Sequence, residues 1–104
     1  MKRPKARILV VEDDPALLRG LADVLVYNGY EVKGVDDGGQ GLDTGLNEAF
    51  DLILLDVMLP TLDGFSICKE VRRKKPQQGI IIITAKGSEE DIVTGFNAGA
   101  DDYI

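Results

Sequence analysis

Short apolar runs that alternate with segments of helical periodicity constrain the fold of this chain more than any other feature of its sequence. The runs lie at residues 7–11, 30–35, 52–56 and 79–84, and a further one begins at Asp102. Runs of this length are typical of strands buried on both faces of a parallel sheet, and their alternation with helices indicates repeated strand–helix units. The pattern therefore predicts an α/β fold with a doubly wound parallel sheet. We expect in it the flavodoxin-like strand order 2-1-3-4-5, which is one of the common orders of such sheets.

Four helices are expected between these strands. The first begins at Pro15, and the second is a weak, glycine-containing helix at residues 41–47. The third ends in the basic run 72–75, and the fourth runs from Ser88 to about Gly99. The residues expected on the buried face of the first helix are Leu17, Leu21, Val24 and Leu25.

Composition and charge limit the possible functions. With 104 residues, of which 44% are hydrophobic and 29% charged, the chain fits one soluble globular domain. The basic start at residues 1–7 precedes an apolar run too short for a signal peptide or a membrane span, so we expect a cytoplasmic protein. A formal charge of −6 argues against direct binding of nucleic acid. Cys68 is the sole cysteine and histidine is absent, which excludes an internal disulfide, His-based zinc sites and Ser-His-Asp triads.

Three acidic residues follow two of the apolar runs. Glu12 and Asp13 end the first run, and Asp56 ends the third. The first and third strands are neighbours in the expected order, so these acids lie side by side at the ligand-binding rim, with Thr84 reaching the same rim. Carboxylates held this close repel one another and need a cation, and hard oxygen ligands with an open face favour Mg²⁺, or Mn²⁺ in its place. The cluster therefore predicts phosphoryl-transfer chemistry.

Five separated motifs, which occur in order along essentially the whole chain, resemble those of bacterial response-regulator receiver domains. The motifs are Val11-Glu12-Asp13-Asp14-Pro15, Leu55-Asp56-Val57-Met58-Leu59-Pro60, Asp63-Gly64-Phe65, Thr84-Ala85 and Gly99-Ala100-Asp101-Asp102-Tyr103-Ile104. The resemblance implies two-component signal transduction, with a sensor histidine kinase as phosphodonor. It also implies an effector domain or downstream protein as target, in a phosphorelay or in transcription regulation.

The resemblance further implies roles for the clustered residues. Asp56 would be the phosphoacceptor, and Glu12, Asp13 and Asp56 would hold Mg²⁺ with help from the backbone carbonyl of Met58. Such a domain is not an enzyme in its own right, although it assists its own phosphorylation and its slow dephosphorylation. The apolar side chain of Met58 cannot orient water by hydrogen bonding, which suggests a long-lived signal.

Two further residues are implied to transmit the phosphorylation signal. Thr84 would donate its hydroxyl to a phosphoryl oxygen, with Ala85 leaving room for the approach. Tyr103 would be the switch residue, whose change of rotamer alters an interaction surface.

The end of the sequence departs from the family pattern. Receiver domains carry a Lys-Pro pair at the end of the fifth strand and then a fifth helix, and neither follows Tyr103 here. We therefore expect residues 1–104 to be a receiver domain truncated at its C-terminus, with the fifth strand incomplete.

Other functions on the same fold are compatible with parts of the sequence. A phosphatase of the haloacid dehalogenase type would need an Asp-x-Asp motif after the first strand, and Met58 occupies the position of its general acid. A flavodoxin-like electron carrier would bring the phosphate of its flavin against the acids 12–14. The stronger alternative is a protein-interaction module that works without phosphorylation, because the lysine is absent.

The expected truncation leads to a prediction about oligomeric state. An unfinished edge strand and an uncovered apolar flank favour a homo-oligomer or a segment-swapped dimer. Light scattering across a concentration series should show association of the 104-residue chain. A monomer at high micromolar concentration, with amides protected from exchange at Ile80–Ile83 and Ile104, would contradict this expectation.

Overall fold

The computed structural model describes residues 5–83 and 89–104, which form a five-stranded parallel sheet and four helices. Along the chain the elements are β1 (Arg7–Val11), α1 (Pro15–Tyr27), β2 (Glu31–Val35), α2 (Gly38–Asn47), β3 (Leu52–Leu55), α3 (Gly64–Lys74), β4 (Gly79–Ile82), α4 (Glu89–Asn97) and β5 (Asp102–Tyr103). In this part of the chain no helix has the length and apolar character needed to cross a membrane.

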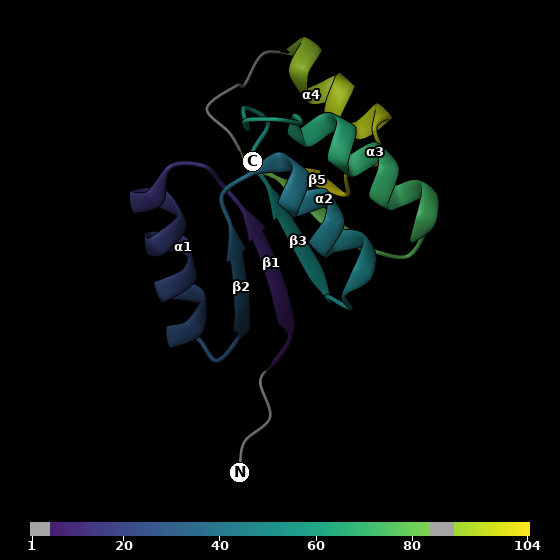
Figure 1. Ribbon diagram of the computed structural model, residues 1–104. Coiled ribbons are helices and arrows are strands. Elements are labelled where there is room, and N and C mark those ends of the chain that lie inside the picture. The colour runs from purple at the N-terminus through teal and green to yellow at the C-terminus, as the bar shows by residue number, and fades with distance from the viewer. Residues whose placement is uncertain (1–4, 84–88) are drawn as a thin grey trace.

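The sheet has the strand order β2-β1-β3-β4-β5, which confirms the predicted doubly wound topology (Figure 1). Val11 at the end of β1 pairs with Val35 of β2 and with Leu55 of β3, and Leu55 in turn pairs with Ile82 of β4. This register brings the carboxyl ends of four strands to one level. Residues that directly follow these strands consequently share one rim of the sheet.

Helices cover the two faces of the sheet unequally (Figure 1). On the face of α2 and α3, a fully buried core joins Leu9, Ile53 and Ile80 of the strands to Ile67 and Val71 of α3. On the face of α1, the buried cluster is smaller. Alternate residues of β1 point to opposite faces, so every residue from Ile8 to Val11 is buried, as expected for a central parallel strand.

Helix α1 presents a different face to the sheet from the one that the sequence predicted. Leu18, Leu21 and Leu25 pack against the smaller core cluster, whereas Leu17 and Val24 are 50% and 62% exposed. Positions 18, 21 and 25 repeat at intervals of three and four, and residues 17 and 24 lie about 100° further round the helix. Leu21 and Leu25 were therefore assigned correctly, and Leu17 and Val24 wrongly.

Helix α2 begins at Gly38, three residues before the predicted start. The side chain of Asp37 caps it by accepting a hydrogen bond of 2.9 Å from the backbone N–H of Gln40. A Cβ atom on Gly38 would lie 1.9 Å from the carbonyl oxygen of Leu62, so the close approach of two backbones requires glycine here. The glycine-rich stretch is thus the packed first turn of a helix.

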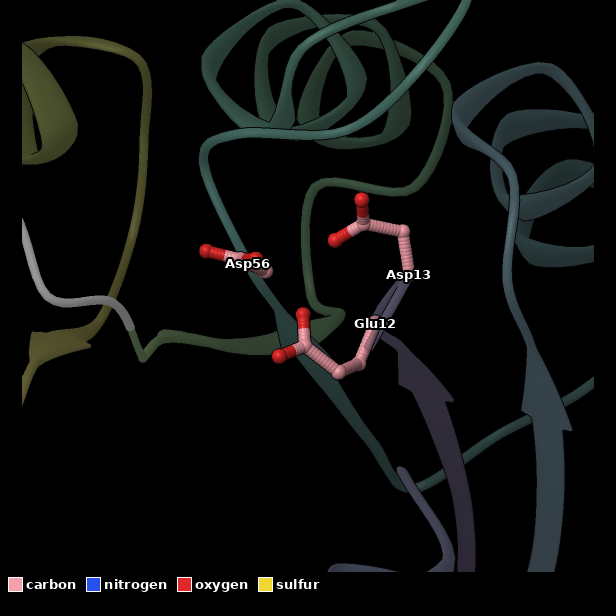
Figure 2. Close-up of side chains that lie close together, drawn as sticks. All are labelled: Glu12, Asp13 and Asp56. Atoms are coloured by element: carbon pink, nitrogen blue, oxygen red, sulfur yellow. The ribbon is translucent and has the colours of Figure 1, made fainter. Parts of the chain in front are cut away.

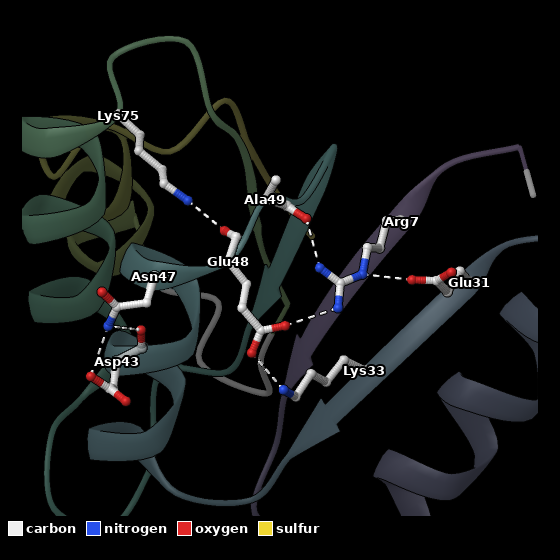
Figure 3. A network of polar contacts seen from close by, with 8 residues as sticks. All are labelled: Arg7, Glu31, Lys33, Asp43, Asn47, Glu48, Ala49 and Lys75. Atoms are coloured by element: carbon white, nitrogen blue, oxygen red, sulfur yellow. Dashed lines mark hydrogen bonds and ion pairs between the residues drawn. The ribbon is translucent and has the colours of Figure 1, made fainter.

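A network of ion pairs and hydrogen bonds lies at the end of the sheet where β1 begins (Figure 3). The Arg7 guanidinium donates to Glu31 at 2.6 Å, to Glu48 at 2.9 Å and to the Ala49 carbonyl at 3.0 Å. Lys33 donates to the second oxygen of Glu48 at 2.6 Å. Lys33 and Arg7 together hold the pKa of the Glu48 carboxyl below its usual value, so the acids at this end of the sheet are neutralised by partners.

The half-buried Arg72 of α3 joins its own helix end and the segment just before β4 to the turn before β5, which is distant in sequence. It donates hydrogen bonds to the carbonyls of Pro76 (2.8 Å) and Gln78 (2.6 Å), which precede β4. It also donates twice to the Gly99 carbonyl, at 2.7 and 2.9 Å, and pairs with Asp101 at 2.9 Å. The same Asp101 carboxylate oxygen accepts the N–H of Ile80 at 2.8 Å. Arg72 therefore ties the entry of β5 to α3 and β4.

This arrangement predicts that Arg72→Met lowers the free energy of unfolding by about 2 to 4 kcal/mol, since several carbonyls and Asp101 lose a charged donor. Arg73→Met is the matched control, because Arg73 is 78% exposed and, within residues 5–83 and 89–104, forms an ion pair only with Glu70. The control should change the free energy by less than about 0.5 kcal/mol. Urea unfolding measures both variants, and equal losses would contradict the special role of Arg72.

Candidate metal centre

Backbone hydrogen bonds continue across the sheet beyond the strand ends and fix the residues that follow β1 and β3. The N–H of Glu12 donates to the Val35 carbonyl at 3.0 Å, and the N–H of Asp56 donates to the Val11 carbonyl at 3.0 Å. Glu12 and Asp56 thus occupy adjacent positions of the ladder. Their proximity follows from strand register and does not depend on the side chains attracting each other.

The structure brings together the three acids that the sequence predicted to converge (Figure 2). One carboxylate oxygen from each of Glu12, Asp13 and Asp56 lies within 4.8 Å of the other two. Glu12 is only 4% exposed, Asp56 is half-buried and Asp13 faces solvent. The cluster therefore has a closed side at Glu12 and an open side at Asp13.

The surroundings of Glu12 disfavour the ionised form of its carboxyl group. Its Oε2 atom is buried and has no hydrogen-bond partner within the described part of the chain. Burial first of all, and then the nearby Asp56 and Asp13 carboxylates, raise the pKa of Glu12 to about 8. A cation among the three carboxylates would offset both the burial and the repulsion, so these residues fit a divalent metal with hard oxygen ligands.

The loop after β3 returns tightly over Asp56. The N–H of Met58 donates to the Asp56 carboxylate at 3.4 Å, and the N–H of Gly64 donates to the Val57 carbonyl at 3.0 Å. A Cβ on Gly64 would lie 2.1 Å from the carbonyl oxygen of Asp56. Gly64 therefore shapes the site, a role that the sequence analysis did not assign although Gly64 stands in one of its motifs.

An open groove of about 650 Å³ lies beside the acids. The residues that line it are Asp13, Val57, Met58, Leu59, Pro60, Asp63 and Phe65. The Met58 side chain is exposed at this groove, which agrees with its predicted place at the site. The contribution of its backbone carbonyl to metal binding stays a prediction.

The other predicted site residues lie outside this cluster or outside the described residues. Thr84 falls in the segment 84–88, which lies outside the described part of the chain, as does Ala85. Tyr103 lies in β5 beyond β4, and its ring packs closely on α4, where a Cβ on Gly95 would approach it to 2.7 Å. Its predicted switching role is not tested by this placement.

Comparison with known proteins agrees with the geometry of the site. A family model described as the response regulator receiver domain matches residues 8–104. The transcriptional activator protein PfeR of Pseudomonas aeruginosa is 43% identical over 101 residues, which cover 97% of this chain and 33% of that protein. The chain spans between a third and a half of the length of the curated relatives it matches.

Solved structures with the same fold include two receiver domains. A CheY-like receiver domain protein from Methanospirillum hungatei JF-1 has a TM-score of 0.91 at 37% identity, covering 99% of this chain and 81% of that one. The receiver domain of sensor histidine kinase PA1611 from Pseudomonas aeruginosa PAO1 has a magnesium ion coordinated in its active site cleft. Its TM-score is 0.87 at 35% identity, and the match covers 95% of this chain and 83% of that one.

The raised pKa of Glu12 predicts how the stability of the metal-free protein depends on pH. Between its ordinary value of 4.5 and the folded value of about 8, the folded protein holds a proton that the unfolded chain has lost. The free energy of unfolding should therefore fall as the pH rises through this window. Urea unfolding in the presence of a chelator measures the slope, which Glu12→Gln should abolish.

Added Mg²⁺ should restore the lost stability most strongly at the high-pH end, where Glu12 must ionise to bind it. Asp13→Ala should remove the stabilisation by Mg²⁺. It should keep most of the dependence of the unfolding free energy on pH, because burial is the largest cause of the raised pKa of Glu12. A pH-independent unfolding free energy in wild type, or equal stabilisation by Mg²⁺ in both proteins, would contradict the assigned metal centre.

Proposed function

Since this chain belongs to the response-regulator receiver domain family, we propose that its acidic cluster accepts a phosphoryl group on Asp56 in two-component signalling. The observation that carries the proposal is the convergence of three carboxylates around a buried acid without a partner, at the ends of adjoining strands. A phosphodonor in the form of a phosphorylated histidine of a sensor kinase is part of the proposal.

The three acids share one role in this proposal, which is to bind a divalent metal. Glu12, Asp13 and Asp56, with the backbone carbonyl of Met58, hold Mg²⁺ or Mn²⁺, and the magnesium ion described for the receiver domain of PA1611 supports this choice. When bound, the ion supplies positive charge that offsets the charge of acceptor and phosphoryl group. Near neutral pH the bound ion would favour the ionised form of Glu12, because burial and the neighbouring acids otherwise raise its pKa to about 8.

Asp56 is the nucleophile in this proposal, and three observations support the choice. It is half-buried, its backbone is fixed by the Val11 carbonyl, and one carboxylate oxygen accepts the N–H of Met58. The other oxygen attacks phosphorus and forms an acyl phosphate, while the bond from phosphorus to the donor's imidazole nitrogen breaks and leaves its electron pair there. Asp13, on the open side, borders the groove through which the donor approaches.

The consequences of phosphorylation belong to the same proposal. Thr84 donates a hydrogen bond to a phosphoryl oxygen, and Tyr103 changes rotamer and thereby the surface around α4 and β5. The name of PfeR, a transcriptional activator, supports an effector that regulates transcription. A cytoplasmic location follows in this proposal, because a kinase draws its phosphoryl groups from ATP.

Incubation with acetyl phosphate and Mg²⁺ should add one phosphoryl group to the wild-type protein, detected by intact mass and located by peptide mass spectrometry on Asp56. Asp56→Asn should remain unmodified, and a chelator should prevent the reaction in wild type. The matched control is Asp43→Asn, an exposed acid of α2 outside the cluster, which should be modified normally. Absence of any acyl phosphate from wild type would favour the phosphorylation-independent interaction module.

A further inference from the structure

The loop that follows Asp56 contains an unfavourable backbone conformation. Thr61 has a φ angle of +74°, in the left-handed region that β-branched residues rarely adopt. Thr61 is the one residue other than glycine with positive φ in the described part of the chain. Some interaction must hold this conformation, because the threonine does not favour it by itself.

The N-terminus of α2 supplies that interaction. The Thr61 hydroxyl donates a hydrogen bond of 2.6 Å to one carboxylate oxygen of Asp37, whose other oxygen accepts the N–H of Gln40. The bond from Thr61, followed by that from Gln40, holds the pKa of Asp37 below its usual value. Asp37 is thus a charged acceptor that serves the helix cap and the loop at once.

Backbone contacts hold the same two segments together beside this bond. The N–H of Gly38 donates to the Pro60 carbonyl at 3.1 Å and joins the two segments. Within the loop, the N–H of Leu62 donates to the same carbonyl at 2.9 Å and closes a three-residue turn centred on Thr61. The Leu62 carbonyl lies so near Gly38 that no side chain fits between them. Residues 60–62 are therefore seated on the first turn of α2, with Thr61 at the centre of the contact.

This contact is linked through Val35 and Met58 to two of the clustered acids, Glu12 and Asp56. Asp37 stands two residues after Val35, whose carbonyl binds the N–H of Glu12. Thr61 stands three residues after Met58, whose N–H binds the Asp56 carboxylate. The short segment 35–38 therefore connects the fixed end of β1 to the loop that carries Met58.

We infer that Asp37 and Thr61 are positioning residues for the acidic site, because their hydrogen bond holds the loop 57–62 in the conformation that sets Met58 against Asp56. Neither residue is a member of the acidic cluster. The inference rests on the proposed function, since it assigns these residues an effect on metal binding and on phosphorylation. It deepens that function by making metal affinity depend on the start of α2.

Titration with Mn²⁺ tests the inference directly. Thr61→Val keeps the size and branching of the side chain and loses the hydroxyl, and it should weaken Mn²⁺ affinity roughly ten-fold, as expected when a residue that orients a metal ligand is removed. Thr61→Ser keeps the hydroxyl and should bind like wild type. Asp43→Ala is the matched control, because it removes a hydrogen bond to Asn47 elsewhere in α2 (Figure 3) and should leave the affinity unchanged.

A double-mutant cycle separates positioning from loss of the helix cap. Asp37→Ala removes both bonds of the carboxylate, yet the double variant with Thr61→Val should bind Mn²⁺ no more weakly than Asp37→Ala alone, because both changes break one contact. In phosphorylation by acetyl phosphate, Thr61→Val should need more Mg²⁺ for half-maximal rate and reach the wild-type rate at saturating Mg²⁺. A merely structural role would not produce this metal-dependent recovery.

The outcomes distinguish this inference from the function on which it rests. If wild type binds Mn²⁺ and is phosphorylated while folded Thr61→Val behaves identically, the inference is overturned and the proposed function stands. Additive losses in the double variant would also overturn it. If wild type neither binds Mn²⁺ nor accepts phosphate, the proposed function fails, and the inference fails with it.

Discussion

The hydrogen-bond ladder of the parallel sheet is the constraint on which the site depends. Glu12 and Asp56 follow β1 and β3, and backbone bonds to Val35 and Val11 hold them next to each other although like charges repel. The apolar strands supply the free energy that makes this possible, since β1 and β3 lie in the buried core. Burial and the neighbouring acids raise the pKa of Glu12 in this arrangement, and a bound cation would offset their effect.

The pKa values of two glutamates at opposite ends of the sheet are shifted in opposite directions. At the end where β1 begins, Glu48 lies between Lys33 and Arg7, and its pKa is lowered. At the other end, Glu12 has acids as neighbours and a buried oxygen without a partner, and its pKa is raised. The difference lies in the partners available, because both carboxyls belong to the same residue type. Glu12 thus lacks, at the end of the sheet that carries the acidic cluster, the positive partners that Glu48 has at the opposite end.

Periodicity was enough to predict a parallel α/β sheet, because apolar runs and helical segments alternate in the local sequence. The acids at the ends of the apolar runs predicted the cluster once the flavodoxin-like strand order, known from other doubly wound folds, was adopted. Contacts between segments that are distant in the sequence were harder to predict. The sequence predicted Leu17 and Val24 on the buried face of α1, yet a neighbouring strip of the helix packs on the sheet. The sequence placed Arg72 only in the basic run that ends a helix. Its bonds to Gly99 and Asp101 were not predicted, because they depend on how α3 meets the turn before β5.

The residues proposed to bind the metal are held with unequal rigidity. The carboxylates of Glu12 and Asp56 come from positions fixed by the sheet, whereas Met58 comes from a loop whose shape depends on contacts outside the site. Gly64 anchors the loop on one side, where no Cβ fits against the Asp56 carbonyl. On the other side, the strained Thr61 needs the start of α2 to keep its conformation. Because the loop needs support at both ends, the geometry around Asp56 depends on α2 and α3 as well as on the strands that carry the acids.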